Sequence, residues 1–260
     1  MEYIVVCLVA LLASGLTFFS GFGLGTILMP VLAIFFPVPI AVAATALAHF
    51  ANNLFKLFLV GRRANKSIVI QFGVPAIFAA VLGAFFLTSA SSIPAMASYQ
   101  IGGHTCEITT VKLVVGLLIV FFSGLEFVPA FAKISIDPKY LPIGGIISGF
   151  FGGLSGNQGA FRSMFLIKAG LAKEEFIGTN VVLAVIVDCG RLTVYGIGLS
   201  SVLSTTMANL GGLILAATIS AFAGAYLGKM ILKTVTLRAI QVIVGVTLIL
   251  LGIALSIGIL

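Results

Sequence analysis

Charged residues are scarce in this chain. Only 8% of its 260 residues are Asp, Glu, Lys or Arg, whereas 60% are hydrophobic and the mean hydropathy is +1.27. A soluble globular domain carries about 25% charged residues. The composition therefore excludes a soluble domain and predicts an all-α polytopic membrane protein.

Patterns of metal sites and enzymes are missing as well. The three cysteines, Cys7, Cys106 and Cys189, are odd in number and far apart, and no CxxC or Cys/His metal spacing occurs. His104, Cys106 and Glu107 lie close together in a polar loop, where chance explains them better than metal binding. Neither HExxH nor a paired-carboxylate site is present, which argues against a membrane-embedded enzyme. We expect no metal, cofactor or catalytic residue.

The net charge of +7 would suggest nucleic acid as the partner of a soluble protein. Here Lys and Arg in cytoplasmic loops explain it more simply, so the expected partner is the lipid bilayer and not nucleic acid. The first apolar run, 3–20, resembles a signal-peptide core, but Glu2 precedes it and no Lys or Arg does. We expect this run to belong to the mature protein.

The apolar stretches differ in length. A spanning helix needs about 20 residues; five stretches reach this length and 111–128 comes close. Three shorter stretches lie beside the glycine-rich turns Gly21–Gly25 and Ser155–Gly159. Two short arms around such a turn predict a hairpin that enters the membrane and returns. The long stretches are 38–60, 69–90, 174–196, 206–228 and 238–259, and the short ones are 26–36, 141–153 and 160–171.

The second half of the chain repeats the first. The matches are few, but they keep their order and fall at hairpin and helix positions. We therefore predict two inverted repeats, 1–132 and 141–260, each a re-entrant hairpin plus three transmembrane helices, joined by a cytoplasmic linker at 133–140. At an offset of 134 residues the pairs are Ser14-Gly15 with Ser148-Gly149, Gly25 with Gly159 and Thr45 with Thr179. Further along the chain, at other offsets, Gly83-Ala84 matches Gly224-Ala225 and 111–124 matches 240–252.

The Lys and Arg residues predict the orientation. The loop after the first long span carries Arg62, Arg63 and Lys66, whereas its counterpart at about 197–205 carries no charge. With three crossings per half, ten Lys and Arg residues fall in the cytoplasm, against Lys112 outside and three within the membrane. Inverted halves around broken segments are typical of secondary transporters. We expect both termini outside an inner membrane.

Polar residues line one face of the first long span. His49, Asn52, Asn53 and Lys56 recur at i, i+3, i+4 and i+7, and Thr45 begins this face. Lys56 lies near the helix end and is expected to snorkel to the cytoplasm rather than to contact a substrate. His49 and Asn53 have an alternative interpretation as hydrogen-bonded packing residues.

The matching helix of the second half also has a polar face, formed by Asn180, Asp188, Arg191 and Tyr195 and begun by Thr179. Asp188 is the one carboxylate that this assignment places in the membrane, so it is a candidate for carrying a coupling proton. A fixed salt bridge to Arg191, three residues on, is the alternative. Asn180 has the further alternative of binding a neighbouring helix.

Arg162 follows the second glycine turn, and no acidic residue lies within ten positions of it. Together with Lys56 and Arg191 against Asp188, it gives the membrane interior an excess of two positive charges. The N-termini of the hairpin arms also favour anions. A guanidinium presents a planar fork of donors that suits an oxyanion. The residues expected to bind a small anion are Arg162, Asn157, Gln158, Ser163, Gly159, Gly25, Thr45, His49, Asn52, Asn53, Thr179, Asn180 and Arg191.

The two glycine turns, the helix openings Ala43–Thr45 and Ile177–Thr179, and the inverted halves resemble the sulfite exporter TauE/SafE family of anion permeases. The likeness is most specific in 152–192 and covers nearly the whole chain. Members are associated with moving sulfite, sulfonates and other sulfur-containing anions across bacterial inner membranes. The resemblance implies a permease for small sulfur oxyanions that works by alternating access. An anion channel is the alternative function. The sequence does not decide whether the protein forms a homodimer.

Overall fold

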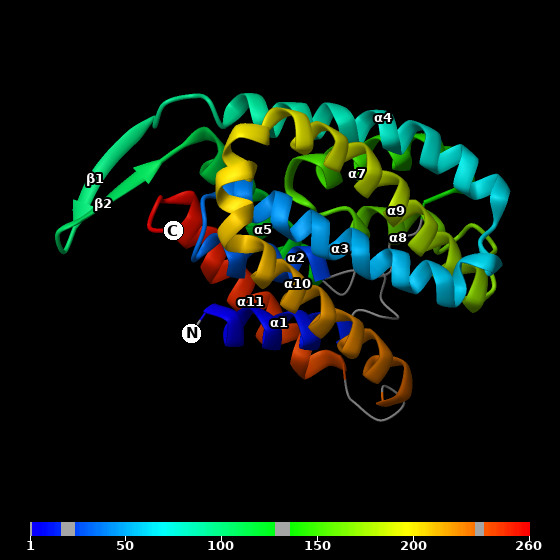
Figure 1. Ribbon diagram of the computed structural model, residues 1–260. Coiled ribbons are helices and arrows are strands. Elements are labelled where there is room, and N and C mark those ends of the chain that lie inside the picture. The colour runs from blue at the N-terminus through cyan, green and yellow to red at the C-terminus, as the bar shows by residue number, and fades with distance from the viewer. Residues whose placement is uncertain (1, 17–23, 128–135, 232–236) are drawn as a thin grey trace.

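The computed structural model describes residues 2–16, 24–127, 136–231 and 237–260, which are helical apart from one β-hairpin and the connections (Figure 1). The helices are α1 (Glu2–Leu16), α2 (Leu24–Ala33), α3 (Val38–Val60), α4 (Lys66–Ala90), α5 (Thr110–Phe127), α7 (Leu141–Ser155), α8 (Gly159–Leu166), α9 (Lys173–Gly198), α10 (Ser200–Ile231) and α11 (Leu237–Ser256), with 3-10 turns η1 (Gly61–Arg63) and η2 (Pro138–Tyr140) and strands β1 (Ala97–Ile101) and β2 (His104–Ile108).

Four of the described helices are long and apolar enough to cross a membrane, which confirms a multi-pass membrane protein. They are Val38–Phe58, Lys66–Ala90, Lys173–Gly198 and Leu210–Gly228, and they coincide with four of the five predicted long spans. The fifth, 238–259, falls on α11, of which Gly245–Ser256 is apolar.

Local sequence explains where the long helices begin. Pro37 precedes α3, and a second proline lies in its first turn, where a missing N–H costs nothing. Asn65 caps α4, since its Oδ1 accepts from the N–H of Ile68 at 3.2 Å. Glu174 and Glu175 occupy the first turn of α9, where a negative charge is favoured by the helix dipole.

Glycines let α7 pack against α4 with the backbones in contact. A Cβ at Gly145 would overlap the carbonyl of Phe72, and one at Gly153 would overlap that of Ala80. Because both partners advance together, the two helices run in the same direction. The first hairpin arm of the second half therefore lies along a long helix of the first half.

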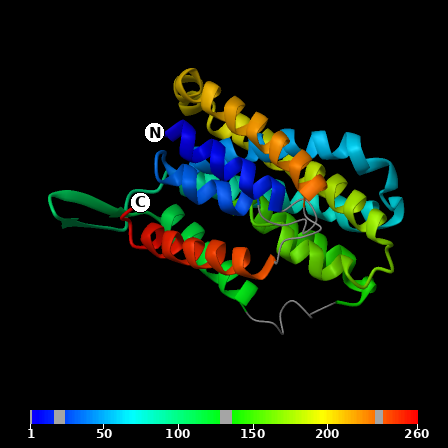
Figure 2. The ribbon, with the colours of Figure 1, turned by 90° about the horizontal axis from the view of Figure 1, so that it is seen from below.

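The same arrangement occurs with the halves exchanged. A Cβ at Gly224 would overlap the carbonyl of Leu11, and one at Gly228 would overlap that of Gly15, so α1 runs parallel to α10. This packing places the predicted signal-like run, 3–20, against a long helix as far as it is described. Figure 2 also shows α5 and α11 side by side.

The helices α3 and α9 lie side by side in opposite directions. Gly178, near the start of α9, is packed against Val60 at the end of α3 and against Arg63 at the end of η1. Further along both helices, His49 and Asp188 are in contact. The two polar faces predicted from sequence therefore meet where α3 and α9 pack together.

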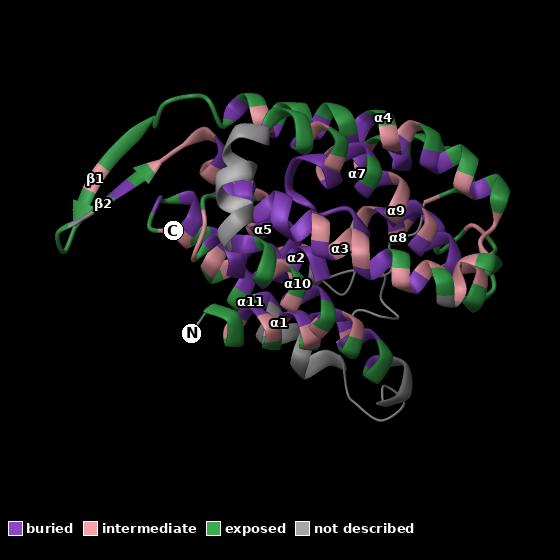
Figure 3. Ribbon diagram, viewed as in Figure 1, coloured by how far each residue is buried: buried purple, intermediate pink, exposed green. Residues whose placement is uncertain are grey.

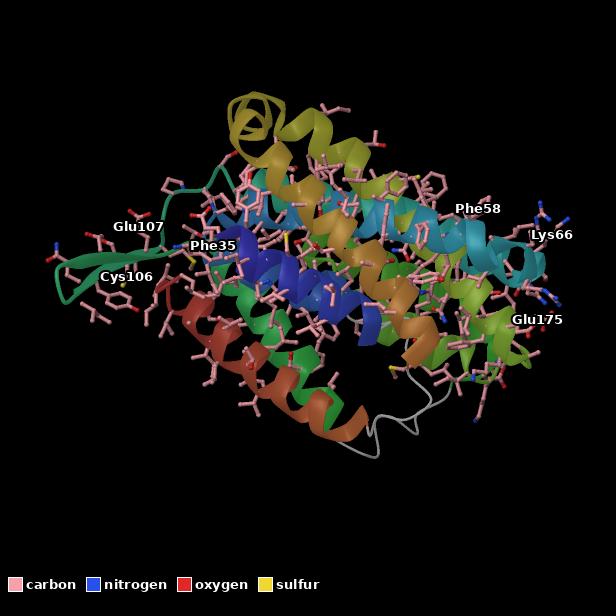
Figure 4. The ribbon with its side chains drawn as sticks, turned by 60° about the horizontal axis from the view of Figure 1, so that its bottom comes forward. Phe35, Phe58, Lys66, Cys106, Glu107 and Glu175 are labelled. Carbon is pink, nitrogen blue, oxygen red and sulfur yellow. The ribbon has the colours of Figure 1, made fainter. Side chains whose placement is uncertain are left out.

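Basic residues and the chain ends lie at opposite ends of the molecule. Figure 4 shows Lys66 and Glu175 at one end and Cys106 and Glu107, on the β-hairpin, at the other. Both marked chain ends lie on the side of the β-hairpin (Figure 1). Exposed residues follow the outer helices between these ends (Figure 3). They include large apolar side chains such as Phe58 (Figure 4), as expected of a surface that faces lipid.

Two predicted connections differ in the structure. The loop predicted at about 197–205 is wrong, because α9 ends at Gly198 and α10 begins at Ser200. The polar outer loop contains an antiparallel hairpin, β1–β2, whose turn consists of Gly102 and Gly103 at φ 57° and 83°. Residues 21–23 of the predicted turn and residues 133–135 of the predicted linker lie outside the described residues.

Candidate functional site

The first turn of α2 lies next to the segment that joins α7 to α8. Gly25, in the first turn of α2, lies beside the connection between α7 and α8: a Cβ on it would be 3.4 Å from the carbonyl oxygen of Gly156 and 3.6 Å from the ring of His49. Gly156 ends α7 in the left-handed region, at φ 83°, which glycine adopts without strain. The first turn of α2 and the connection between α7 and α8 therefore lie together beside His49 of α3.

Asp188 is at the centre of the cluster beside these tips. Its Oδ1 accepts hydrogen bonds from Nε and Nη2 of Arg191, at 2.9 and 2.7 Å, and from Nε2 of Gln158 at 3.3 Å. Its Oδ2 lies 2.7 Å from Nδ1 of His49. The salt bridge to Arg191, one of the two interpretations of this carboxylate, is present, and Asp188 ties α9 to both α3 and the second hairpin.

A chain of hydrogen bonds leads from Asp188 to Asn180, and its chemistry fixes the direction of each amide. Nη1 of Arg162 donates to Oε1 of Gln158 at 3.1 Å, so the amide nitrogen of Gln158 must face Asp188. Nε of Arg162 donates to Oδ1 of Asn180 at 2.7 Å. Because a guanidinium can only donate, the amide nitrogen of Asn180 points away from Arg162.

The second hairpin is held against α9 through its backbone. Nη1 of Arg191 donates to the carbonyl of Gly152 at 3.3 Å, and the hydroxyl of Tyr195 donates to that of Gly153. Within the hairpin, the Ser148 hydroxyl donates to the carbonyl of Gln158 at 2.8 Å. These bonds fix the position from which Gln158 and Arg162 reach the cluster.

The cluster is buried and carries more positive than negative charge. Arg191 and Asp188 are 0% exposed, Arg162 2% and Lys56 7%. The predicted snorkelling of Lys56 is therefore wrong: it lies inside, close enough to His49 for their charges to interact. Three cations and one carboxylate leave an excess of two positive charges among the buried side chains described. Burying unbalanced charge costs several kcal/mol per ion, so an anion would be stabilised here.

Several buried polar atoms near these residues have no hydrogen-bond partner among the described residues. One of them is Nδ2 of Asn180, a donor at the end of the hydrogen-bond chain that starts at Asp188. An unsatisfied buried donor costs about 1–3 kcal/mol unless a ligand or water accepts from it. The other such atoms at predicted site residues are Thr45 Oγ1, Asn52 Nδ2, Asn157 Oδ1 and Ser163 Oγ.

The structure brings part of the predicted set together. His49, Gln158, Asn180 and Arg191 join Arg162 and Asp188 in one network, with Gly25 beside it, and Asn53 contacts His49 through its amide. Gly159 is the first residue of α8. Three others have different partners. The Thr179 hydroxyl accepts from the N–H of Asn65, Asn52 accepts from Ser14, and Asn157 donates to Ser155.

Sequence reasoning missed the residues that hold the hairpin. Ser148 was noticed only as a match to Ser14, and that match was the signal that could have identified it. Gly152 and Gly153 act through carbonyl oxygens, which leave no sequence pattern. In the described part of the chain no group of three His, Cys, Asp or Glu side chains could hold a metal ion.

Comparison with known sequences identifies the family. A sequence model described as sulfite exporter TauE/SafE matches residues 6–255. No curated protein and no solved structure matches the chain. The membrane-spanning helices fit a family of membrane transporters. Because the match covers nearly the whole sequence, this chain belongs to the sulfite exporter TauE/SafE family of anion permeases.

Proposed function

We propose that this protein is a secondary transporter that moves small sulfur oxyanions, sulfite or organosulfonates, across the inner membrane by alternating access. The anion binds beside Arg162 and Asn180, where the second hairpin meets α9. The observation that carries this proposal is the orientation of Asn180: its buried Nδ2 is a donor with no acceptor among the described residues, in a cluster with excess positive charge.

The chemistry of this place suits an oxyanion. Arg162 supplies a permanent charge and a planar set of donors, and the Asn180 amide supplies a neutral donor beside it. The return arm α8 begins at Gly159, so the positive end of its dipole lies at the hairpin tip. A cation would meet this excess of positive charge and would be repelled.

Helix directions support an inverted repeat with re-entrant hairpins. The equivalent helices α3 and α9 are antiparallel, and each first hairpin arm packs on the other half, α1 on α10 and α7 on α4. Arms of 15 and 8 residues, α7 and α8, reach about 22 and 12 Å, less than the ~30 Å of a bilayer core. The basic end then faces the cytoplasm, and both termini lie outside.

A carrier fits this geometry better than a channel. The charged residues of the cluster are at most 7% exposed, so the protein is closed around them, as expected of an occluded step in alternating access. A channel would pass anions without saturation at moderate concentrations and without counter-transport. Flux into proteoliposomes, measured against substrate concentration and in exchange mode, distinguishes the two.

The test of the site is Arg162→Ala, studied by calorimetry on purified protein with sulfite and with a sulfonate. Loss of a charge-assisted hydrogen bond of about 1.5–3 kcal/mol should weaken binding roughly tenfold to a hundredfold. Arg162→Lys should restore part of the affinity, because a point charge cannot reproduce the fork. Lys168→Ala, which removes an exposed cation just beyond α8, is the matched control and should bind normally.

Two results would count against the proposal. One is an Arg162→Ala protein that has the wild-type unfolding temperature and binds the anion with unchanged affinity. The other is a wild-type protein that binds none of the sulfur oxyanions. Asn180→Leu should also weaken anion binding without changing the charge, because it removes the Nδ2 donor together with the oxygen that accepts from Arg162.

A further inference from the structure

His49 is the member of the cluster whose side chain ordinarily changes charge near neutral pH. It lies between Asp188 on α9 and Asn53 on its own helix. Its side chain is 14% exposed, whereas that of Asp188 is fully buried. The imidazole is therefore the less covered of the two side chains.

Asp188 is held in its ionised form by the groups around it. Oδ1 accepts from two guanidinium nitrogens of Arg191 and from the amide of Gln158, whose orientation Arg162 fixes. Adding a proton to this oxygen would displace one of these donors. The carboxylate also fixes the imidazole, because Nδ1 of His49 must carry a hydrogen to donate to Oδ2 at 2.7 Å.

The second ring nitrogen is then the one that titrates. The amide nitrogen of Asn53 lies 3.0 Å from Nδ1 and 3.2 Å from Nε2 of His49, so it lies over the ring and not in line with either nitrogen, and it donates to the backbone carbonyl of His49 at 2.9 Å. The lone pair on Nε2 is therefore the place where a proton can add. Once protonated, Nε2 is a donor and needs an acceptor.

The charges facing His49 come from two helices. Asp188 and Arg191 face it from α9, and Lys56 lies on α3. The second hairpin presents the neutral Gln158 next to Asp188, with Arg162 behind it, and α2 presents Gly25. Protonation adds one more positive charge to a cluster that already has an excess of two, and a bound anion compensates this addition.

We infer that His49 carries the proton that couples anion movement to the proton gradient, while Asp188 is its fixed counter-ion. This inference rests on the proposed function. The lone pair on Nε2 takes up one proton when the anion binds, and the proton leaves to water on the side where the anion is released. Because coupling between two sites is reciprocal, protonation strengthens anion binding and anion binding favours protonation by the same factor.

The first experiment observes the imidazole directly. The chain has two histidines, so His104→Gln leaves His49 as the one imidazole and does not alter the cluster. In protein labelled with nitrogen-15 in histidine, methanesulfonate is added near pH 7.5; this anion does not itself titrate in that range. We expect the Nε2 resonance to move to the position of a protonated nitrogen, while Nδ1 stays protonated throughout.

The second experiment counts protons. Calorimetry of methanesulfonate binding, repeated in buffers with different ionisation heats, should show uptake of about one proton per anion above the titration of His49 and none well below it. Affinity should fall by up to about tenfold per pH unit in the upper range. His49→Gln, which can still donate to Asp188, should bind without proton uptake and without this pH dependence.

The outcomes separate the inference from the function beneath it. If the anion binds but the Nε2 resonance does not move, or if His49→Gln still takes up a proton, His49 is not the carrier and the inference is wrong, although the anion site stands. If wild-type protein binds no sulfur oxyanion, the proposed function fails and the inference fails with it. Thermal unfolding of each variant provides the folding control.

Discussion

In the proposed inverted repeat, the two halves share the order of their helices but not their polar residues. At the offset of 134 residues, Arg162 corresponds to Leu28 and Asp188 to Leu54. In the other direction, His49 corresponds to Leu183 and Lys56 to Gly190. Each half thus supplies different polar residues to one cluster. A repeated scaffold allows the protein two similar conformations. The site need not be repeated, because one cluster binds the substrate in both conformations.

This division assigns different tasks to the halves. The second half supplies the guanidinium groups and the carboxylate, which in the proposed site fix the charge and the position of the anion. The first half supplies His49, whose charge can change. If the two repeats have these different roles, residues at equivalent positions should respond very differently to substitution. The following predictions compare such positions.

The largest effect concerns the sidedness of the connections that follow α3 and α9. Single cysteines at Ala64, between α3 and α4, and at Ser201, in the first turn of α10, in a background without the three native cysteines, should react with an impermeant thiol reagent from opposite sides of the membrane. The physical reason is that α3 and α9 are antiparallel. Labelling of both from one side would exclude the inverted repeat.

The next effect concerns the buried ion pair. Asp188→Leu reproduces the first-half residue Leu54 but leaves Arg191 buried without its carboxylate, and should lower stability by about 3–5 kcal/mol. Adding Arg191→Leu removes the unpaired charge, so the double variant should unfold at a higher temperature than Asp188→Leu alone while transport stays lost. Leu54→Ala, at a position 42% exposed, is the control and should have little effect. Additive losses in the cycle would show that the two residues do not act as a pair.

A smaller effect distinguishes the two glycine contacts. Gly149 and Gly15 are repeat partners, but a Cβ at Gly149 would overlap the carbonyl of Ala76, whereas one at Gly15 would lie 3.0 Å from that of Gly224. Gly149→Ala should therefore cost about 1–3 kcal/mol of stability and Gly15→Ala less. Gly196→Ala, where no atom lies within 4 Å, should cost nothing. Unfolding temperatures in one detergent give the ranking, and a reversed order would contradict it.

The sequence predicted what depends on local pattern. The long spans follow from runs of apolar residues, and the face carrying His49 and Asn53 follows from helical spacing. It did not predict which residues meet across the fold. The contact between Arg162 and Asn180, 18 positions apart, depends on how a short helix returns beside α9, and Lys56 was misjudged because its depth depends on neighbours that no local pattern shows.

The β-hairpin was also missed, although its signal was present. Gly102 and Gly103 form a two-residue turn between alternating strands, which is a hairpin pattern. In a chain this apolar, the outer segment was treated as a loop with scattered polar residues. The overall composition of the chain thus does not reveal short strands or helices outside the membrane.

The smallest effect separates the paired threonines, which are equivalent in the repeat and buried alike. The hydroxyl of Thr179 accepts from the N–H of Asn65 at 3.0 Å, next to the start of α4, so Thr179→Val should cost about 1 kcal/mol of stability and leave anion affinity unchanged. Thr45 Oγ1 has no partner among the described residues, so Thr45→Val should not lower stability. If the hydroxyl donates to the anion, affinity should fall about fivefold, as for one neutral hydrogen bond. Both quantities should be measured on both variants. Thr179→Val should lower the unfolding temperature only, and Thr45→Val should lower the calorimetric affinity only. Loss of affinity in Thr179→Val with Thr45→Val unaffected would place the anion nearer the end of α9 than the cluster described above.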